Sequence, residues 1–123
     1  MQTIELQNTN MDIKLFDNLI MMIKNFIEKY KLSDIDKKVD AIIIDFSPLQ
    51  EKNFLISEEQ EINQYDNFLE YLEQLEEYLE NIEDLALTTN IAQKVDKALD
   101  IITLIQFRIS GAISDYRLEH QCK

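Results

Sequence analysis

The chain has 123 residues, of which 46% are hydrophobic and 29% are charged, with one glycine and one proline. This length and composition indicate a single globular domain built from a few long helices, and they exclude an intrinsically disordered chain. The formal net charge of −12 argues against direct binding to nucleic acid or to an anionic membrane, because both require a positive surface.

Residues 1–9 are expected to form a flexible tail. They lack the basic segment and the apolar segment of a secretory signal, and no apolar run in the chain is long enough to span a bilayer. Cys122 is the only cysteine, so no internal disulfide is expected. The expected compartment is therefore the cytoplasm.

The first predicted helix runs from about Met11 to Lys31. Its apolar residues recur at steps of three and four, and they form the stripe Ile13, Phe16, Ile20, Ile23, Ile27 and Tyr30. A second stripe beside it consists of Leu15, Leu19, Met22 and Phe26. Two adjacent stripes indicate that at least two neighbours cover this helix.

Residues 33–56 fit two structures. A helix is favoured by the start signal of Ser33 with Asp36 and by the helical spacing of Ile35, Val39, Ile42 and Phe46. This helix ends before Pro48, and Leu49, Phe54 and Leu55 then lie back on the bundle in a loop. The alternative is a small strand hairpin at 41–56, because AIIIDF is also a good buried strand and FLI could pair with it.

The stretch from Ser57 to Leu87 carries nearly all of the net charge. Eleven of the 24 acidic residues and no Lys or Arg lie between Asn53 and Gln93, which leaves 13 acidic against 12 basic residues elsewhere. Ser57 with Gln60 has capping-box spacing, which predicts a helix from Glu58. Its apolar residues have the spacing of a seam that faces a partner helix, namely Tyr65, Phe68, Leu72, Leu75, Leu79, Ile82 and Ala86.

The opposite face of this acidic helix is made of carboxylates and amides. Its carboxylates between positions 66 and 84 are Asp66, Glu70, Glu73, Glu76, Glu77, Glu80, Glu83 and Asp84. Like charges three or four residues apart repel each other by about 0.2–0.5 kcal/mol per pair before salt screening. A helix needed only for packing normally intersperses Lys or Arg, so this row favours a surface that binds a cationic partner. A solvated face that only keeps the protein soluble is the alternative.

The last predicted helix runs from Ile91 to about Leu118 and forms an antiparallel hairpin with the acidic helix, and residues 119–123 are expected to fray. Its seam consists of Ile91, Val95, Ala98, Ile102, Ile105, Ile109, Ala112 and Tyr116. Further apolar residues lie off the seam, so this helix is either the centre of the bundle or half of an oligomer interface. In the second case, Leu104 and Phe107 form the homodimer contact.

These elements predict an all-α antiparallel bundle of three to four helices, with an α+β fold as the alternative if 41–56 is a hairpin. No catalytic site, cofactor or metal is expected. The only histidine is His120, near the end of the chain, and the only glycine is Gly111, which lies inside a helix and cannot form a phosphate-binding loop. The carboxylates share one solvated environment, whereas acid–base catalysis needs contrasting ones.

We interpret the chain as a non-enzymatic binding protein that neutralises a basic partner, such as a nucleic-acid-handling enzyme, in the manner of an immunity protein, an antitoxin or a phage anti-defence protein. The eight carboxylates span about 27 Å of helix, or about one per 3.4 Å, which is close to the phosphate spacing along one DNA strand. A small acidic secretion or assembly chaperone or adaptor, and a structural homodimer, are the alternatives.

Overall fold

The structure is a computed structural model, and it describes residues 11–28, 35–83 and 89–121. Four α-helices make up most of these residues. The helices are α2 (Met11–Glu28), α3 (Ile35–Phe46), α4 (Glu59–Glu83) and α5 (Thr89–Gln121), and the short 3₁₀ helix η2 (Ser47–Glu51) follows α3. The described residues contain no strand. The predicted all-α bundle with a long C-terminal hairpin is therefore confirmed.

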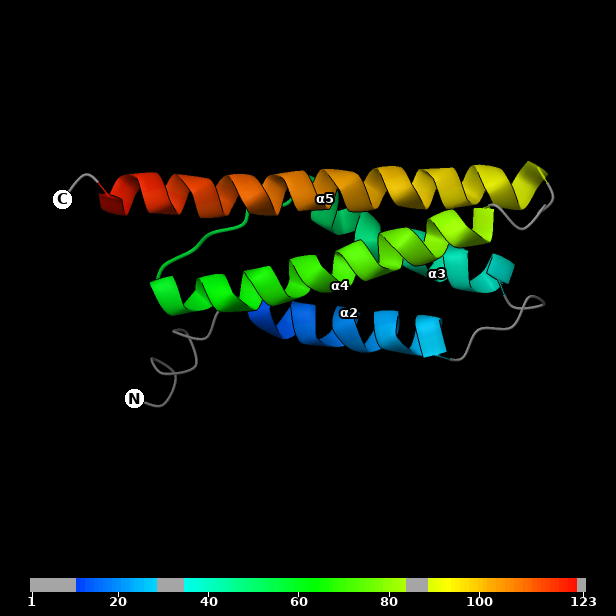
Figure 1. The fold of residues 1–123 in the computed structure, drawn as a ribbon, viewed down its shortest axis with the longest axis horizontal. Coiled ribbons are helices and arrows are strands. Elements are labelled where there is room, and N and C mark those ends of the chain that lie inside the picture. Colours follow the sequence, from blue (N-terminus) through cyan, green and yellow to red (C-terminus); the bar gives the residue numbers. More distant parts are fainter. Residues whose placement is uncertain (1–10, 29–34, 84–88, 122–123) are drawn as a thin grey trace.

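Each helix runs opposite to the one that precedes it along the chain (Figure 1). In the bundle, α4 packs against α2 and α5, while α3 packs against α5 and, over a smaller area, against α2. The helices thus occupy the corners of a square, with α4 diagonal to α3. None of the helices in the described ranges has the length and apolar character that crossing a membrane requires.

The core is formed by the predicted helical stripes. The α4 side chains that are buried are Ile62, Tyr65, Phe68, Leu72, Leu75, Leu79 and Ile82. They meet the buried seam of α5, from Val95 to Ile109, and the stripes of α2 around Phe16 and Ile23. Three predicted seam residues, Ile13, Tyr30 and Ala86, lie outside the side chains that the structure describes.

The alternative of a strand hairpin at 41–56 is wrong. Ile35, Val39, Ile42 and Phe46 are all buried, and this spacing of four, three and four residues puts them on one face of α3. Pro48 then lies in the first turn of η2, where its missing N–H leaves no hydrogen bond unmade. Leu49 and Phe54 lie back on the bundle as expected, but Leu55 does not, since 73% of its surface is exposed.

The start of α4 is capped by a different side chain from the one expected. The carboxylate Oε1 of Glu61 accepts hydrogen bonds from the backbone N–H groups of Ser57 (2.7 Å) and Glu58 (3.1 Å). Gln60 instead donates to the carboxylate of Glu58. The helix accordingly begins one residue later than predicted, at Glu59, and Glu61 provides the reach-back bond of the cap.

Candidate binding surface

The outer face of α4 is positioned by the seam on its other side. Because the seam residues from Tyr65 to Ile82 are buried, the side of the helix opposite to the seam faces solvent. Five of the predicted carboxylates are exposed: Asp66, Glu70, Glu73, Glu77 and Glu80. We call these five, together with Glu76, the acidic row.

Glu76 lies at the edge of the row nearest α5. It is partly buried, and its carboxylate accepts a hydrogen bond of 3.4 Å from the hydroxyl of Thr103. The side chain of Glu83 and the whole of Asp84, which the sequence also assigned to this face, lie outside the described residues. The structure therefore brings together six of the eight predicted carboxylates.

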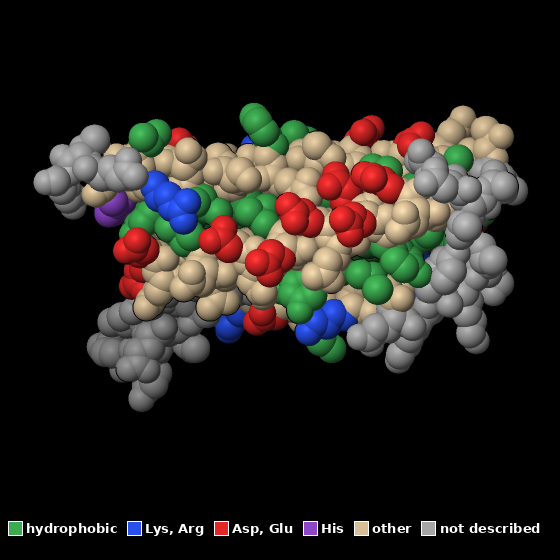
Figure 2. Space-filling model, viewed as in Figure 1, with side chains coloured by type: hydrophobic (Ala, Val, Ile, Leu, Met, Phe, Trp, Pro, Cys, Tyr) green, Lys and Arg blue, Asp and Glu red, His purple; other side chains and the backbone are tan. Residues whose placement is uncertain are grey.

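No described Lys or Arg forms an ion pair with any member of the acidic row. Figure 2 shows Asp and Glu side chains gathered along α4, with the Lys and Arg side chains seen from this side lying beside them. Lys24 of α2 does reach α4, but its Nζ lies over the ring of Tyr71, 5.3 Å from the ring centre. The repulsion within the row is therefore not relieved by an ion pair with any described cation of the chain.

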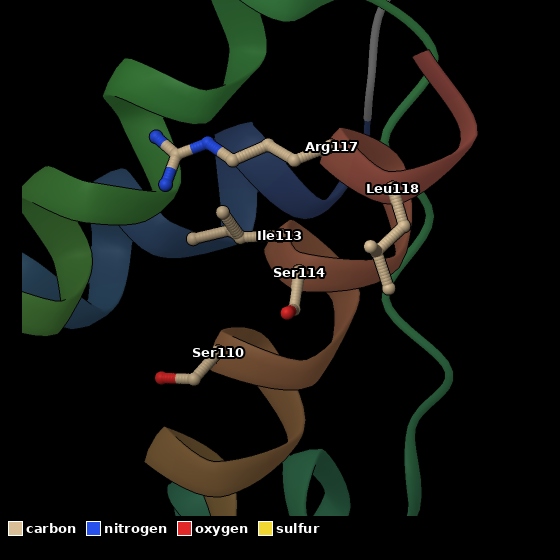
Figure 3. Close-up of a pocket in the computed structure, with 5 residues that line it drawn as sticks. All are labelled: Ser110, Ile113, Ser114, Arg117 and Leu118. Atoms are coloured by element: carbon tan, nitrogen blue, oxygen red, sulfur yellow. The ribbon is translucent and has the colours of Figure 1, made fainter. Parts of the chain in front are cut away.

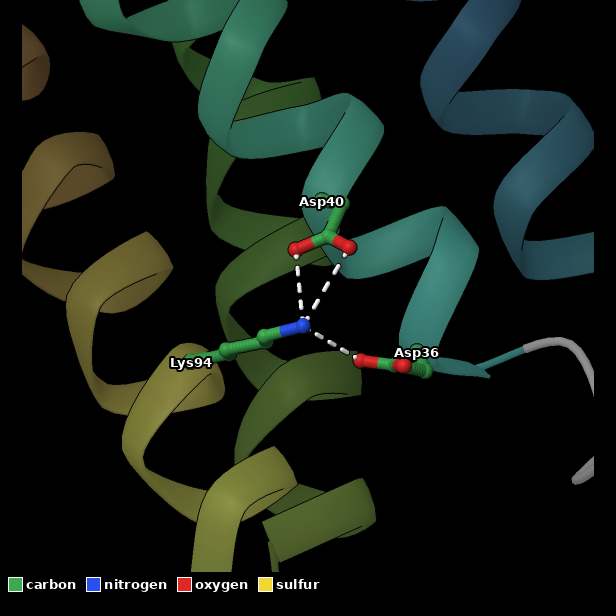
Figure 4. A network of polar contacts seen from close by, with 3 residues as sticks. All are labelled: Asp36, Asp40 and Lys94. Atoms are coloured by element: carbon green, nitrogen blue, oxygen red, sulfur yellow. Dashed lines mark hydrogen bonds and ion pairs between the residues drawn. The ribbon is translucent and has the colours of Figure 1, made fainter.

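Lys94 is a cation that forms ion pairs elsewhere in the bundle, between α5 and α3. Its Nζ lies 2.7 Å from Asp36 and 3.2 Å from Asp40, so one lysine of α5 forms ion pairs with two carboxylates of α3 (Figure 4). The hydrogen bond to Asp36, then that to Asp40, raises the pKa of Lys94 above its usual 10.5. This charge cluster links α3 to α5, and none of its three residues belongs to the acidic row.

Polar and aromatic groups border the acidic row. The amide side chains of Gln60, Asn67, Gln74 and Asn81 are all exposed on α4. Tyr71 and Tyr78 are partly buried against the core, and the ring of Tyr78 packs edge-on against Phe26 with ring centres 5.3 Å apart. A partner that docks on the row thus meets hydrogen-bonding amides and two aromatic rings that packing already holds in place.

The predicted oligomer-contact residues lie on the outer side of α5. Phe107 is 77% exposed and Leu104 is 40% exposed, although α5 buries most of its other apolar side chains. Together with Leu55 and Arg108 they line an open groove of about 610 Å³ between α5 and residues 52–55. Sequence reasoning missed Leu55, because an apolar residue between two buried elements is expected to be buried too.

Leu118 was also missed, and it is 60% exposed. It is two heptads beyond Leu104, so a search for apolar residues at seven-residue steps on the outer side of α5 could have found it. On the neighbouring side of the same helix, Arg117 extends toward the first turns of α4 (Figure 3). With Ser110, Ser114 and Leu118 it lines a hollow of about 290 Å³.

The end of α5 carries His120. His120 is exposed, stacks on the ring of Tyr116 with ring centres 3.9 Å apart, and places its Nδ1 atom 2.8 Å from the Tyr116 carbonyl oxygen. Within the described ranges, no three His, Cys, Asp or Glu residues are grouped so that they could hold a metal ion.

No protein-family model, curated protein or solved structure matches this chain.

Proposed function

We propose that this chain is a non-enzymatic binding protein that neutralises a basic partner, in the cytoplasm, by covering the partner's nucleic-acid-binding groove. The observation that carries the proposal is the acidic row on α4, which none of the described Lys or Arg residues pairs with. A positive groove supplies the missing countercharge. We propose an immunity protein, an antitoxin or a phage anti-defence protein as the class of protein.

The spacing of the row supports a partner that normally holds nucleic acid. From Asp66 to Glu80, six carboxylates project from about 21 Å of helix, a mean interval of about 4.2 Å, which is of the same order as the roughly 3.4 Å between charges along one DNA strand. Lys and Arg side chains that are spaced to follow a phosphate backbone can therefore meet carboxylates at a similar spacing.

The rigidity of the row supports tight binding. Every seam residue from Tyr65 to Ile82 is buried, so the carboxylates are attached to a helix that is already held in its final shape. A preformed surface loses little conformational entropy when it binds. Charge attraction also accelerates the encounter, and its effect weakens as salt is added.

The test is to remove charge from the row and to remove the same amount of charge elsewhere. In the row variant, Glu73→Gln, Glu77→Gln and Glu80→Gln are combined. The matched control combines Asp17→Asn, Asp45→Asn and Asp96→Asn, three exposed carboxylates on α2, α3 and α5. Each protein is immobilised, exposed to lysate of its native cell, and eluted with a NaCl gradient.

We expect the wild type and the control to retain a basic protein that elutes at the same salt concentration and is displaced by duplex DNA. The row variant should release that protein at a much lower salt concentration, because it lacks half of the described carboxylates of the row. Equal retention by the row variant and the control overturns the proposal.

A further inference from the structure

The outer side of α5 presents exposed apolar side chains, and residues 52–55 lie along one border of this surface. Leu104, Phe107, Gly111 and Leu118 are all exposed, and a rotation of 100° per residue puts them within an arc of about 60°. Figure 1 shows α5 along one edge of the bundle, and Figure 2 shows hydrophobic side chains protruding at that edge. Exposed apolar side chains that gather on one helix face mark a contact surface.

Gly111 lies at the centre of this surface, seven residues from Leu104 and seven from Leu118. A Cβ atom built at Gly111 meets nothing within 4 Å, so the bundle itself does not require a glycine here. Glycine is an unfavourable residue inside a helix. Its presence is explained if the backbone of another helix comes close at this point.

Two opposite charges on the same side of α5 have no partner among the described residues. Arg108 is partly buried, its Nε is buried without a hydrogen-bond partner, and no described carboxylate pairs with it. Asp115 is exposed and no described Lys or Arg pairs with it. The two residues are separated by about 10.5 Å along the helix axis, so they do not neutralise each other.

We infer that this surface binds a second copy of the same chain, with the two α5 helices antiparallel and a two-fold axis at Gly111. In this register residue n lies opposite residue 222 − n, so Leu104 faces Leu118 of the second copy and the two Gly111 backbones meet. Arg108 lies beside Asp115 of the second copy, on the same side of the axis. Each contact occurs twice, as in every two-fold interface.

In the same arrangement, Phe107 also contacts the second copy. Helical geometry puts it over Ser114 and Leu118 of the second copy, which line the hollow of about 290 Å³ together with Ser110 and Arg117 (Figure 3). Cavities of about 150 Å³ already admit benzene, so this hollow can receive a phenyl ring.

Little of the net charge of −12 lies on this surface. Residues 104–118 contain Arg108, Arg117 and only one acidic residue, Asp115. No residue of the acidic row belongs to the surface, so the dimer is independent of the proposed function and would present two acidic rows.

The experiment is sedimentation velocity of the full chain with a charge swap. We expect the wild type to sediment at twice its mass of 14.6 kDa. Arg108→Asp and Asp115→Arg should each give monomers, because each places like charges together, and the double variant should restore the dimer. Lys97→Asp, an exposed charge reversal on α5 outside the overlap, should remain dimeric.

The Gly111→Leu variant distinguishes a loss of the dimer from a loss of folding. It should give a monomer whose melting temperature, followed by circular dichroism, is at least that of a monomeric charge variant, because a Cβ atom here meets nothing within 4 Å and leucine favours a helix more than glycine does. A wild type that sediments at 14.6 kDa at every concentration overturns the inference. So does a double variant that stays monomeric, or an Arg108→Asp variant that stays dimeric.

Discussion

Phe16 is the side chain that ties α2 to α4 at one end of the core. Its ring stacks on Phe68 with ring centres 4.1 Å apart and meets the edge of Tyr65 at 5.1 Å. Truncation leaves a cavity among rings that other contacts hold in place. We expect Phe16→Ala to lower the free energy of unfolding by about 3–5 kcal/mol, measured by urea unfolding.

Met21 provides the control for this change, since it lies on the same helix and is exposed. Met21→Ala should change the free energy of unfolding by less than about 0.5 kcal/mol. Equal losses for the two variants would show that Phe16 does not have the core role that its burial indicates.

At the scale of elements, Lys94 joins α5 to α3 through Asp36 and Asp40. Because these bonds raise the pKa of Lys94 above 10.5, their stabilising effect is fully present below that pH. It is lost as the pH rises through the folded-state pKa. We expect Lys94→Gln to lower the melting temperature at pH 7, by less than a core truncation does, and the difference from wild type to shrink above pH 10.5.

Lys97 is the matched control, because it is exposed on the same helix and pairs with no described carboxylate. Lys97→Gln should melt close to wild type at both pH values. A Lys94→Gln deficit that keeps its size at high pH would contradict an ionic origin.

For the whole molecule, charge opposes folding at low salt. The net charge is −12, and the acidic row places like charges three and four residues apart with no countercharge from the described cations. We therefore expect the melting temperature to rise when NaCl is raised from about 10 mM to about 150 mM, because the Debye length falls from about 30 Å to about 8 Å.

The row variant with Gln at 73, 77 and 80 should be more stable than wild type at low salt, by about 1 kcal/mol from the lost repulsions, and should respond less to NaCl. The control with Asn at 17, 45 and 96 should keep the wild-type salt response more closely. Identical responses of the two variants would mean that total charge, and not the row, opposes folding. If the row binds a partner as proposed, its cost to the stability of α4 is a trade of stability for function.

The helices and the exposed side of α4 followed from spacing within single segments. The seam from Tyr65 to Ile82 is buried as predicted, so the carboxylates on the opposite side of the helix had to face outward. The same spacing identified the apolar face of α3, but it could not exclude a strand at 41–56. The run AIIIDF satisfies both patterns, and only its packing against α5 decides between them.

The amino-acid sequence alone determined that α4 has a carboxylate face without basic residues of its own. Helical periodicity is a local property, and no Lys or Arg lies between Asn53 and Gln93. Only the tertiary structure decided that Lys24 contacts Tyr71 and that Lys94 binds Asp36 and Asp40, and thus that neither neutralises the row. It also decided that α5 keeps Leu104 and Phe107 exposed while Ile101 and Ile113 are buried. Both outcomes depend on which helices become neighbours, and this is determined by packing between segments that are far apart in the chain.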